Sequence, residues 1–199
     1  MRVVLADYGA GNLRSVCSAL VRAGAEPIVS LEPCEVRDAP LAVIAGVGHT
    51  GSAARGLEER GLADALRVRV ELGRPLLGIC VGLQLLFGES EEGGQGLGIL
   101  AGRVERLRAR RVPHMGWNRL DVVDGSPILA GLEGADVYFA HSYACVPDEP
   151  VTAATVEHDG PVVAAVERGC VAGVQFHPER SAAPGARLLE NVLAWSRSV

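Results

Sequence analysis

One cysteine of this chain stands in a pattern that favours a nucleophile. Cys80 is the middle residue of Gly78-Ile79-Cys80-Val81-Gly82, between a buried apolar run and an apolar helical segment. The pattern is a cysteine version of the nucleophile elbow, a tight turn that pushes its central side chain out of a sheet. The sulfur then lies at the start of a helix, whose positive dipole end favours the thiolate. The Val81 N–H points to the same spot and could hold a developing oxyanion.

The four other cysteines are interpreted differently. A free cysteine is most often an inert core thiol, and we expect this of Cys17, Cys34, Cys145 and Cys170. The five cysteines are odd in number and form no Cys-x-x-Cys pair. With an apolar N-terminal run too short for a secretory signal, this predicts reduced thiols and a cytoplasmic protein.

A nucleophilic cysteine needs a base and a group that orients the base. Phe176-His177-Pro178-Glu179 offers both, directly after a branched run typical of a strand. If this segment is extended, residues two apart share a face at roughly 7 Å. The Glu179 carboxylate would then fix the tautomer of the His177 ring. The sequence therefore predicts a triad of Cys80, His177 and Glu179.

Other candidate sites are weaker. We expect His114 and His141 to be structural, and His49 and His158 to lie in loops. The spacing of these residues is not that of metal ligands, so we expect no metal.

Two glycine turns follow predicted strands. Gly46-Val47-Gly48 comes one strand before the elbow and could present a backbone N–H to the site. Gly9-Ala10-Gly11 is similar to a dinucleotide-binding turn, but Arg14 replaces its third glycine, where the helix packs closely on the strand. We therefore reject dinucleotide binding.

Composition narrows the class of protein. The 199 residues are 48% hydrophobic and 22% charged, with a formal net charge of −5. These values exclude intrinsic disorder and argue against nucleic acid or an anionic membrane as the main partner. All 19 basic residues are arginine, which excludes Schiff-base chemistry on lysine. We expect the arginines between 103 and 111 to form a solvated or docking face.

In the first half of the chain, predicted strands alternate with predicted helices, and these elements must position the candidate residues. Buried strands are expected over 3–6, 27–31, 41–45 and 75–79, and helices over 13–21, 57–72 and from Leu83 onward. We expect the second and third strands to be buried on both faces, as parallel strands are. Strands that alternate with helices indicate βαβ units and a parallel sheet.

The second half is different, with short strand-like segments from 99 to 174. Segments 151–157 and 162–167 flank Asp159-Gly160-Pro161 and predict a hairpin. A helix is expected over 184–196, and the acidic, glycine-rich segment 88–96 is expected to be a solvated loop. The sequence thus predicts an α/β fold: a mostly parallel central sheet flanked by helices, with a nucleophile elbow and an antiparallel β extension. We expect residues 1–199 to form a single domain.

Longer motifs around these residues resemble the class I, triad-type glutamine amidotransferases. The resemblance rests on the segment from Gly78 to Leu86 and on Gly173-Val174-Gln175-Phe176-His177-Pro178-Glu179. Three further segments (7–15, 113–118 and 138–143) are similar to the glutaminase subunits of imidazole glycerol phosphate synthase. The similarity extends over nearly the whole chain.

The resemblance implies a role for each matching position. Cys80 would be the nucleophile, His177 the acid and base, and Glu179 its orienter. The implied oxyanion donors are the N–H groups of Val47 and Val81, the implied L-glutamine contacts are Gly48, Gln84, Ser142 and Tyr143, and the implied partner contacts are Asn12, Trp117, Tyr138 and Arg180. No cofactor is implied. The implied partner is a cyclase subunit in a heterodimer, which uses the ammonia to make imidazole glycerol phosphate and an aminoimidazole carboxamide ribotide in histidine biosynthesis.

The chain departs from the family pattern at three positions. Ala45 stands where proline usually precedes the oxyanion turn, Thr50 where an aromatic residue is common, and Arg180 where lysine is common. Loss of the proline frees φ at position 45 and so affects how firmly the Val47 amide is held.

Three alternatives remain open at this point. One is another glutaminase of the same class, serving pyridoxal phosphate synthesis or a nucleotide synthetase, which segments 7–15 and 113–118 argue against. A second is a cysteine hydrolase or peptidase that acts without a partner. A third is a regulatory subunit with a decayed site, which the intact set of Cys80, His177 and Glu179 argues against.

Overall fold

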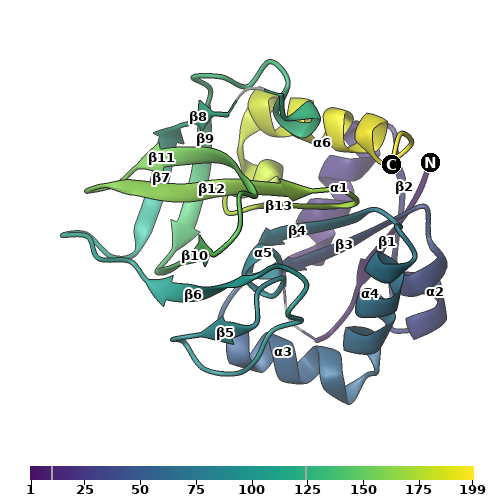
Figure 1. Cartoon of the computed structure of the whole chain (residues 1–199). Coiled ribbons are helices and arrows are strands. Elements are labelled where there is room, and N and C mark those ends of the chain that lie inside the picture. Colours follow the sequence, from purple (N-terminus) through teal and green to yellow (C-terminus); the bar gives the residue numbers. More distant parts are fainter. Residues whose placement is uncertain (10, 124) are drawn as a thin grey trace.

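The computed structural model describes residues 1–9, 11–123 and 125–199 (Figure 1). The strands are β1 (Arg2–Ala6), β2 (Glu26–Ser30), β3 (Leu41–Gly46), β4 (Leu76–Cys80), β5 (Glu89–Ser90), β6 (Gly102–Arg106), β7 (His114–Arg119), β8 (Asp121–Val122), β9 (Asp136–His141), β10 (Tyr143–Pro147), β11 (Thr152–Glu157), β12 (Pro161–Arg168) and β13 (Val171–Val174). The helices are α1 (Leu13–Arg22), α2 (Pro33–Asp38), α3 (Thr50–Glu59), α4 (Leu62–Glu71), α5 (Val81–Gln84) and α6 (Ala182–Trp195), with 3₁₀ turns η1 (Pro127–Leu129) and η2 (Pro178–Arg180).

The central sheet has eight strands in the order β2-β1-β3-β4-β13-β12-β11-β8. The first five run parallel, and β12, β11 and β8 continue the sheet in antiparallel pairing. Every residue of β3 and β4 is buried, as expected for strands covered on both faces. The predicted α/β fold with an antiparallel extension is confirmed.

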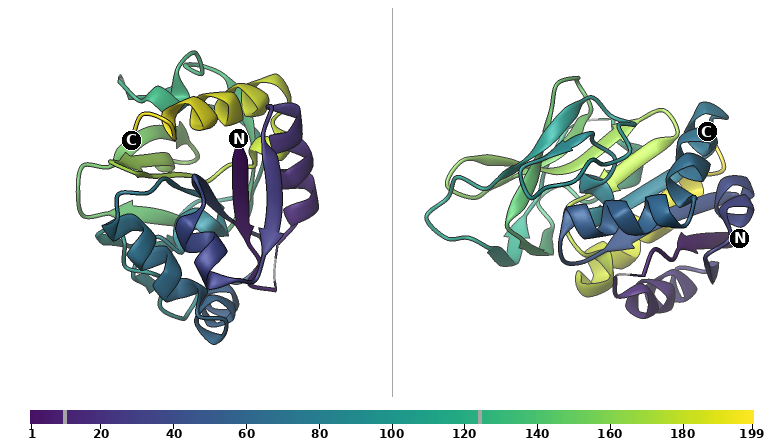
Figure 2. Two further views of the ribbon diagram at one scale, coloured as in Figure 1. Left: turned by 90° about the vertical axis from the view of Figure 1, so that its right-hand side faces the viewer. Right: turned by 90° about the horizontal axis from the view of Figure 1, so that it is seen from below.

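Helices cover both faces of the parallel half. In Figures 1 and 2, α1 and α6 lie on one face and α2, α3 and α4 on the other. Among the described residues, most buried hydrophobic side chains belong to one contiguous cluster, which includes residues of both halves. None of the helices in the described ranges has the length and apolar character needed to cross a membrane.

Two smaller sheets complete the second half, at one side of the central sheet (Figure 2, right). Strand β6 pairs with β10 and β5, and β7 pairs with β9 as a two-stranded ribbon. The predicted hairpin is β11 and β12, and Asp159 and Gly160 in its turn both have positive φ. A turn of this kind matches the twist of an antiparallel pair.

Two helix predictions were wrong. The single helix expected over 57–72 is two helices, because Gly61 adopts the left-handed conformation (φ 66°, ψ 14°) between α3 and α4. The helix expected from Leu83 starts at Val81 and contains only four residues. Helix α2, which contains six residues, was not predicted.

One burial prediction was also wrong. Strand β2 is an edge strand, and Ile28 and Val29 are 39% and 44% exposed, so it is not buried on both faces. None of the residues 88–96 is buried, as expected of a solvated segment, but the segment is not only a loop. It contains β5, and the Glu92 carboxylate accepts hydrogen bonds from the Thr50 N–H and hydroxyl at 2.7 Å each.

A buried arginine ties three elements together. Arg69 of α4 is fully buried and donates to the carbonyls of Pro75, Val36, Arg37 and Ala39 at 2.7–3.0 Å. Three of these carbonyls lie at the C-terminal end of α2, where a positive charge is favourable. The guanidinium therefore fixes α2 and the start of β4 against α4.

We expect Arg69→Met to lower the free energy of unfolding by about 3 kcal/mol or more, because buried carbonyls lose their donors. Urea unfolding followed by circular dichroism measures this. Arg55→Met, on the exposed side of α3, is the control and should change stability by less than about 0.5 kcal/mol. Equal unfolding midpoints for the two variants would refute the role given to Arg69.

Candidate active site

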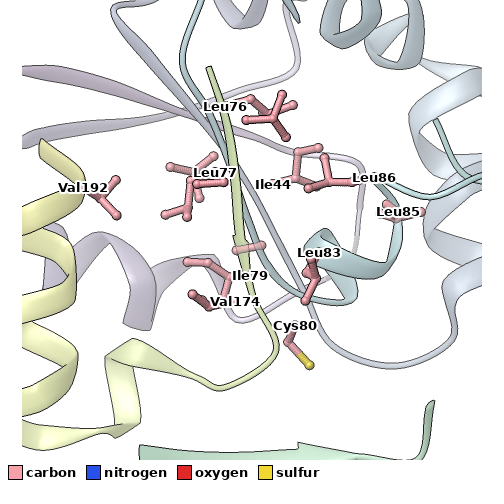
Figure 3. Close-up of a cluster of buried hydrophobic side chains, with 14 of the residues drawn as sticks. Ile44, Leu76, Leu77, Ile79, Cys80, Leu83, Leu85, Leu86, Val174 and Val192 are labelled. Carbon is pink, nitrogen blue, oxygen red and sulfur yellow. The ribbon is translucent and has the colours of Figure 1, made fainter. Parts of the chain in front are cut away.

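The predicted elbow joins β4 to α5. Cys80 has φ 55° and ψ −108°, a backbone conformation that residues other than glycine rarely adopt. The flanking glycines are sterically required. A Cβ on Gly82 would lie 1.9 Å from the Ile44 carbonyl oxygen, and one on Gly78 would lie 2.6 Å from the Gly82 carbonyl oxygen. In Figure 3 the Cys80 sulfur points away from the hydrophobic cluster that supports the turn.

Strand register places the other predicted groups beside the elbow. Gly46 at the end of β3 pairs with Cys80, so the turn with Val47 lies next to the nucleophile. Strand β13 pairs in parallel with the other edge of β4, with Val174 opposite Ile79. Because the carboxyl ends of parallel strands meet at one edge of a sheet, the segment after β13 also reaches the site.

The predicted base and its orienter are in contact. His177 Nδ1 lies 2.9 Å from Glu179 Oε1, and their side chains are 5% and 3% exposed. The predicted reason for this contact was wrong: His177 is extended, but Pro178 begins the turn η2, and this turn brings the carboxylate back to the ring. Among the described residues, Glu179 Oε2 is buried and has no hydrogen-bond partner.

Electrostatics favour a charged imidazole. Burial by itself lowers the pKa of His177, but hydrogen bonds with Cys80 and Glu179 and their negative charges outweigh burial and raise this pKa to about 10. An imidazole that holds its proton beside both a carboxylate and the nucleophilic sulfur is suited to acid–base catalysis on that sulfur.

A cleft of about 230 Å³ opens at the nucleophile. Of the predicted site residues, it is lined by Val47, Gly48, Cys80, Val81, Gln84, Ser142 and Tyr143. The structure thus brings together the residues predicted for the oxyanion and for the substrate. The sequence analysis missed the other lining residues, which are Glu92, Pro113, Met115, Ala140 and His141.

Tyr8 is a further residue that the sequence analysis did not single out. Its buried hydroxyl donates to the Ala45 carbonyl at 2.9 Å, and a Cβ on Gly46 would lie 1.9 Å from this hydroxyl. Burial, followed by the charges of Cys80 and Asp7, raises the pKa of Tyr8, so the hydroxyl stays a donor. Tyr8 therefore supports the strand end that carries Val47. Its position two residues after the end of β1 was the available signal.

His114 and His141 form a buried pair, as expected for structural histidines. His141 Nδ1 donates to the Tyr143 carbonyl at 2.8 Å, which leaves its Nε2 to accept from His114 Nδ1 at 3.0 Å. The pKa of His114 is lowered to about 4 and that of His141 to about 3, first because burial disfavours the charged rings. His158 stacks on His114 and lowers both values further.

These two lowered pKa values predict loss of stability in acid. The unfolded chain binds both protons below about pH 6.5, whereas the folded chain does not until about pH 4 or lower. Between these limits we expect each histidine to lower the free energy of unfolding by up to about 1.4 kcal/mol for each unit by which pH falls. Urea unfolding at pH 7 and pH 5 measures this, and His141→Gln should flatten the pH dependence. An unchanged dependence in this variant would contradict the role of His141.

Three of the four predicted partner contacts lie together. The Arg180 guanidinium lies 4.2 Å from the centre of the Tyr138 ring, and Trp117 meets the same ring edge to face at 6.1 Å. Trp117 is 55% exposed, and Met115 on the same strand is 64% exposed. Asn12, the fourth, is exposed and immediately precedes α1. Ala10, part of the same motif, lies outside the described residues.

Comparison with known proteins identifies the family of this chain. The profile of class-I glutamine amidotransferases matches residues 4–194. The imidazole glycerol phosphate synthase subunit HisH of Geobacillus kaustophilus is 50% identical over 195 residues (93% of this chain and 92% of the relative), and that of Rhodospirillum rubrum is 46% identical (98% and 100%). A solved structure described as glutamine amidotransferase shares the fold with a TM-score of 0.79, at 25% identity over 98% of each chain. The chain belongs to the class I glutamine amidotransferase family.

Proposed function

We propose that this chain is the glutaminase subunit of imidazole glycerol phosphate synthase. It hydrolyses L-glutamine with Cys80, His177 and Glu179 and supplies the ammonia to a cyclase partner in histidine biosynthesis. The observation that carries this proposal is the elbow itself, where a strained cysteine meets a buried histidine–glutamate pair. The names of the relatives that are 50% and 46% identical support the choice of synthase.

The chemistry follows from the contacts of His177. Its Nδ1–H donates to Glu179, so its other ring nitrogen is available to take the Cys80 proton. The thiolate attacks the side-chain amide carbon of glutamine, and the N–H groups of Val81 and Val47 are proposed to hold the resulting oxyanion. His177 then protonates the leaving nitrogen, and ammonia departs from the thioester.

Water completes the cycle. His177, neutral after giving up its proton, removes a proton from a water molecule that attacks the thioester carbon. Collapse of the second oxyanion breaks the carbon–sulfur bond, releases glutamate and returns the thiolate facing the imidazolium. Gly48, Gln84, Ser142 and Tyr143 line the cleft and are proposed to hold the substrate.

A compact surface supports the proposed partner. Trp117, Tyr138 and Arg180 form one aromatic and cationic patch, extended by the exposed Met115. The patch lies close to the catalytic pair, because the His177 N–H donates to the Tyr138 carbonyl and Arg180 directly follows Glu179. We propose that the cyclase docks here.

Residues 1–199 are proposed to act as one domain, which the single contiguous core supports. A cytoplasmic location is proposed from the cysteines, all five of which are free.

Ammonia release from glutamine tests the proposal. The purified chain is assayed alone, then with the cyclase subunit, and then with the cyclase subunit and its nucleotide ligand. We expect strong stimulation by the liganded partner. High activity without stimulation would assign the chain to another partner, and hydrolysis of other amides or esters without any partner would favour the cysteine hydrolase alternative.

A further inference from the structure

A glutamine side chain contacts the nucleophilic sulfur. Gln175 immediately follows β13 and is fully buried. Its Nε2 donates to Cys80 Sγ at 3.6 Å, an ordinary distance for an N–H···S hydrogen bond. The Gln175 N–H also donates to the Ala164 carbonyl of β12 at 2.8 Å, which fixes the backbone from which the side chain extends.

The orientation of this amide is determined by its neighbours. The Tyr143 carbonyl can only accept, and it lies 2.9 Å from Gln84 Nε2, so the Gln84 amide must present its NH₂ group. The same NH₂ group lies 3.2 Å from Gln175 Oε1. Since Gln84 donates there, the oxygen of Gln175 faces Gln84 and its nitrogen faces the sulfur. The chain of donors therefore runs from Gln84 to Gln175 to Cys80.

The start of this chain is itself held in place. The Tyr143 carbonyl also accepts from His141 Nδ1, and His141 is paired with His114. Gln84 is 3% exposed, and the Tyr143 carbonyl and Gln175 Oε1 hold its NH₂ group. Both glutamine amides are thus fixed by buried partners before any substrate arrives.

We propose that Gln175 is a further catalytic residue, whose amide N–H stabilises negative charge on Cys80 Sγ. This inference rests on the proposed glutaminase function. The hydrogen bond favours the thiolate before attack on the substrate. It acts again when the second tetrahedral intermediate collapses, because the electron pair of the breaking carbon–sulfur bond returns to the sulfur. His177 provides the proton transfers, and Gln175 provides a donor that keeps its proton throughout.

Gln175→Met tests the proposal, because methionine keeps the length of the side chain and lacks the donor. Hydrogen bonds to charged groups are strong, but sulfur is a weak acceptor, so we expect kcat for glutamine to fall about 10-fold with KM changed less than about 3-fold. The rate of Cys80 alkylation by iodoacetamide is measured as a function of pH. The midpoint of this pH profile should move upward by about one pH unit. The alkylation rate of the Cys80→Ala protein is subtracted, because it gives the contribution of the other four thiols. Gln95→Met, on an exposed loop, is the matched control and should behave as wild type.

A second variant keeps the test decisive if methionine prevents folding. Gln175→Glu has the same shape, but its ionised form places a negative charge beside the sulfur. Its loss of kcat and of alkylation rate should therefore grow as pH rises from 6 to 8. A folded Gln175→Met or Gln175→Glu protein with the wild-type alkylation profile, or one changed only in KM, would overturn the proposal. A wild type that releases no ammonia would instead refute the proposed function and leave the comparison of thiol pKa values intact.

Discussion

Cys80→Ala is expected to lower the rate of ammonia release from glutamine by ~10⁴-fold or more, in the presence of the partner and without it. Loss of a nucleophile removes the whole covalent route, so the effect is far larger than that of a single hydrogen bond. Ammonia formed from saturating glutamine is the direct measurement. Appreciable turnover by this variant would refute the assignment of the nucleophile.

The alanine variant also separates catalysis from folding. Alanine carries a Cβ, as cysteine does, so the turn at φ 55° keeps its strain and the backbone has no reason to relax. Binding of the cyclase should be retained, because Cys80 is buried and the proposed docking patch does not include it. If the variant lost activity and partner binding together, the loss of activity would be a folding effect.

Gly82→Ala is expected to have the second largest effect. Its Cβ would lie 1.9 Å from the Ile44 carbonyl oxygen, a backbone atom of a central strand that cannot turn away. We expect destabilisation of about 3 kcal/mol and, since α5 must shift with the elbow, a loss of glutaminase activity of ~10²-fold or more. Thermal unfolding and ammonia release measure the two effects.

Gly88→Ala is the matched control. Gly88 is also close to the elbow in sequence, but the nearest atom to a Cβ added there would be 3.9 Å away. This variant should keep its stability within about 0.5 kcal/mol and its full activity. If both alanine variants behaved alike, the crowding at Gly82 would not be what shapes the elbow.

The parts of the site that the sequence predicts are those with short-range causes. A nucleophile elbow is encoded by glycines two residues on either side of Cys80. A side chain at position 78 would collide with the backbone of Gly82, and one at position 82 would collide with the backbone of Ile44. His177 and Glu179 are neighbours in the chain, so their contact needs only one local turn. The strands β3 and β4 are fully apolar and were recognised for the same local reason.

The remaining parts depend on contacts between distant segments. Gln175 lies 95 positions from Cys80 and 91 from Gln84 in the sequence. No local pattern around any of these residues indicates that they are in contact. Glu92 was assigned to a solvated loop because its segment is acidic and glycine-rich. Its contact with Thr50 spans 42 positions and leaves no signal in the local sequence. Strand β2 was predicted to be buried because its composition is apolar, yet its place at the sheet edge is a property of the whole topology.

The backbone conformation of Cys80 has an evolutionary consequence. Residues other than glycine pay ~1–3 kcal/mol to occupy such a region, whereas glycine adopts it readily. Stability by itself therefore favours glycine at position 80, and only the need for a thiol retains the cysteine there against that gradient. If the gene were duplicated and one copy encoded a protein that no longer had to cleave glutamine, that protein would gain stability through Cys80→Gly. The substitution would then identify a catalytically inactive copy.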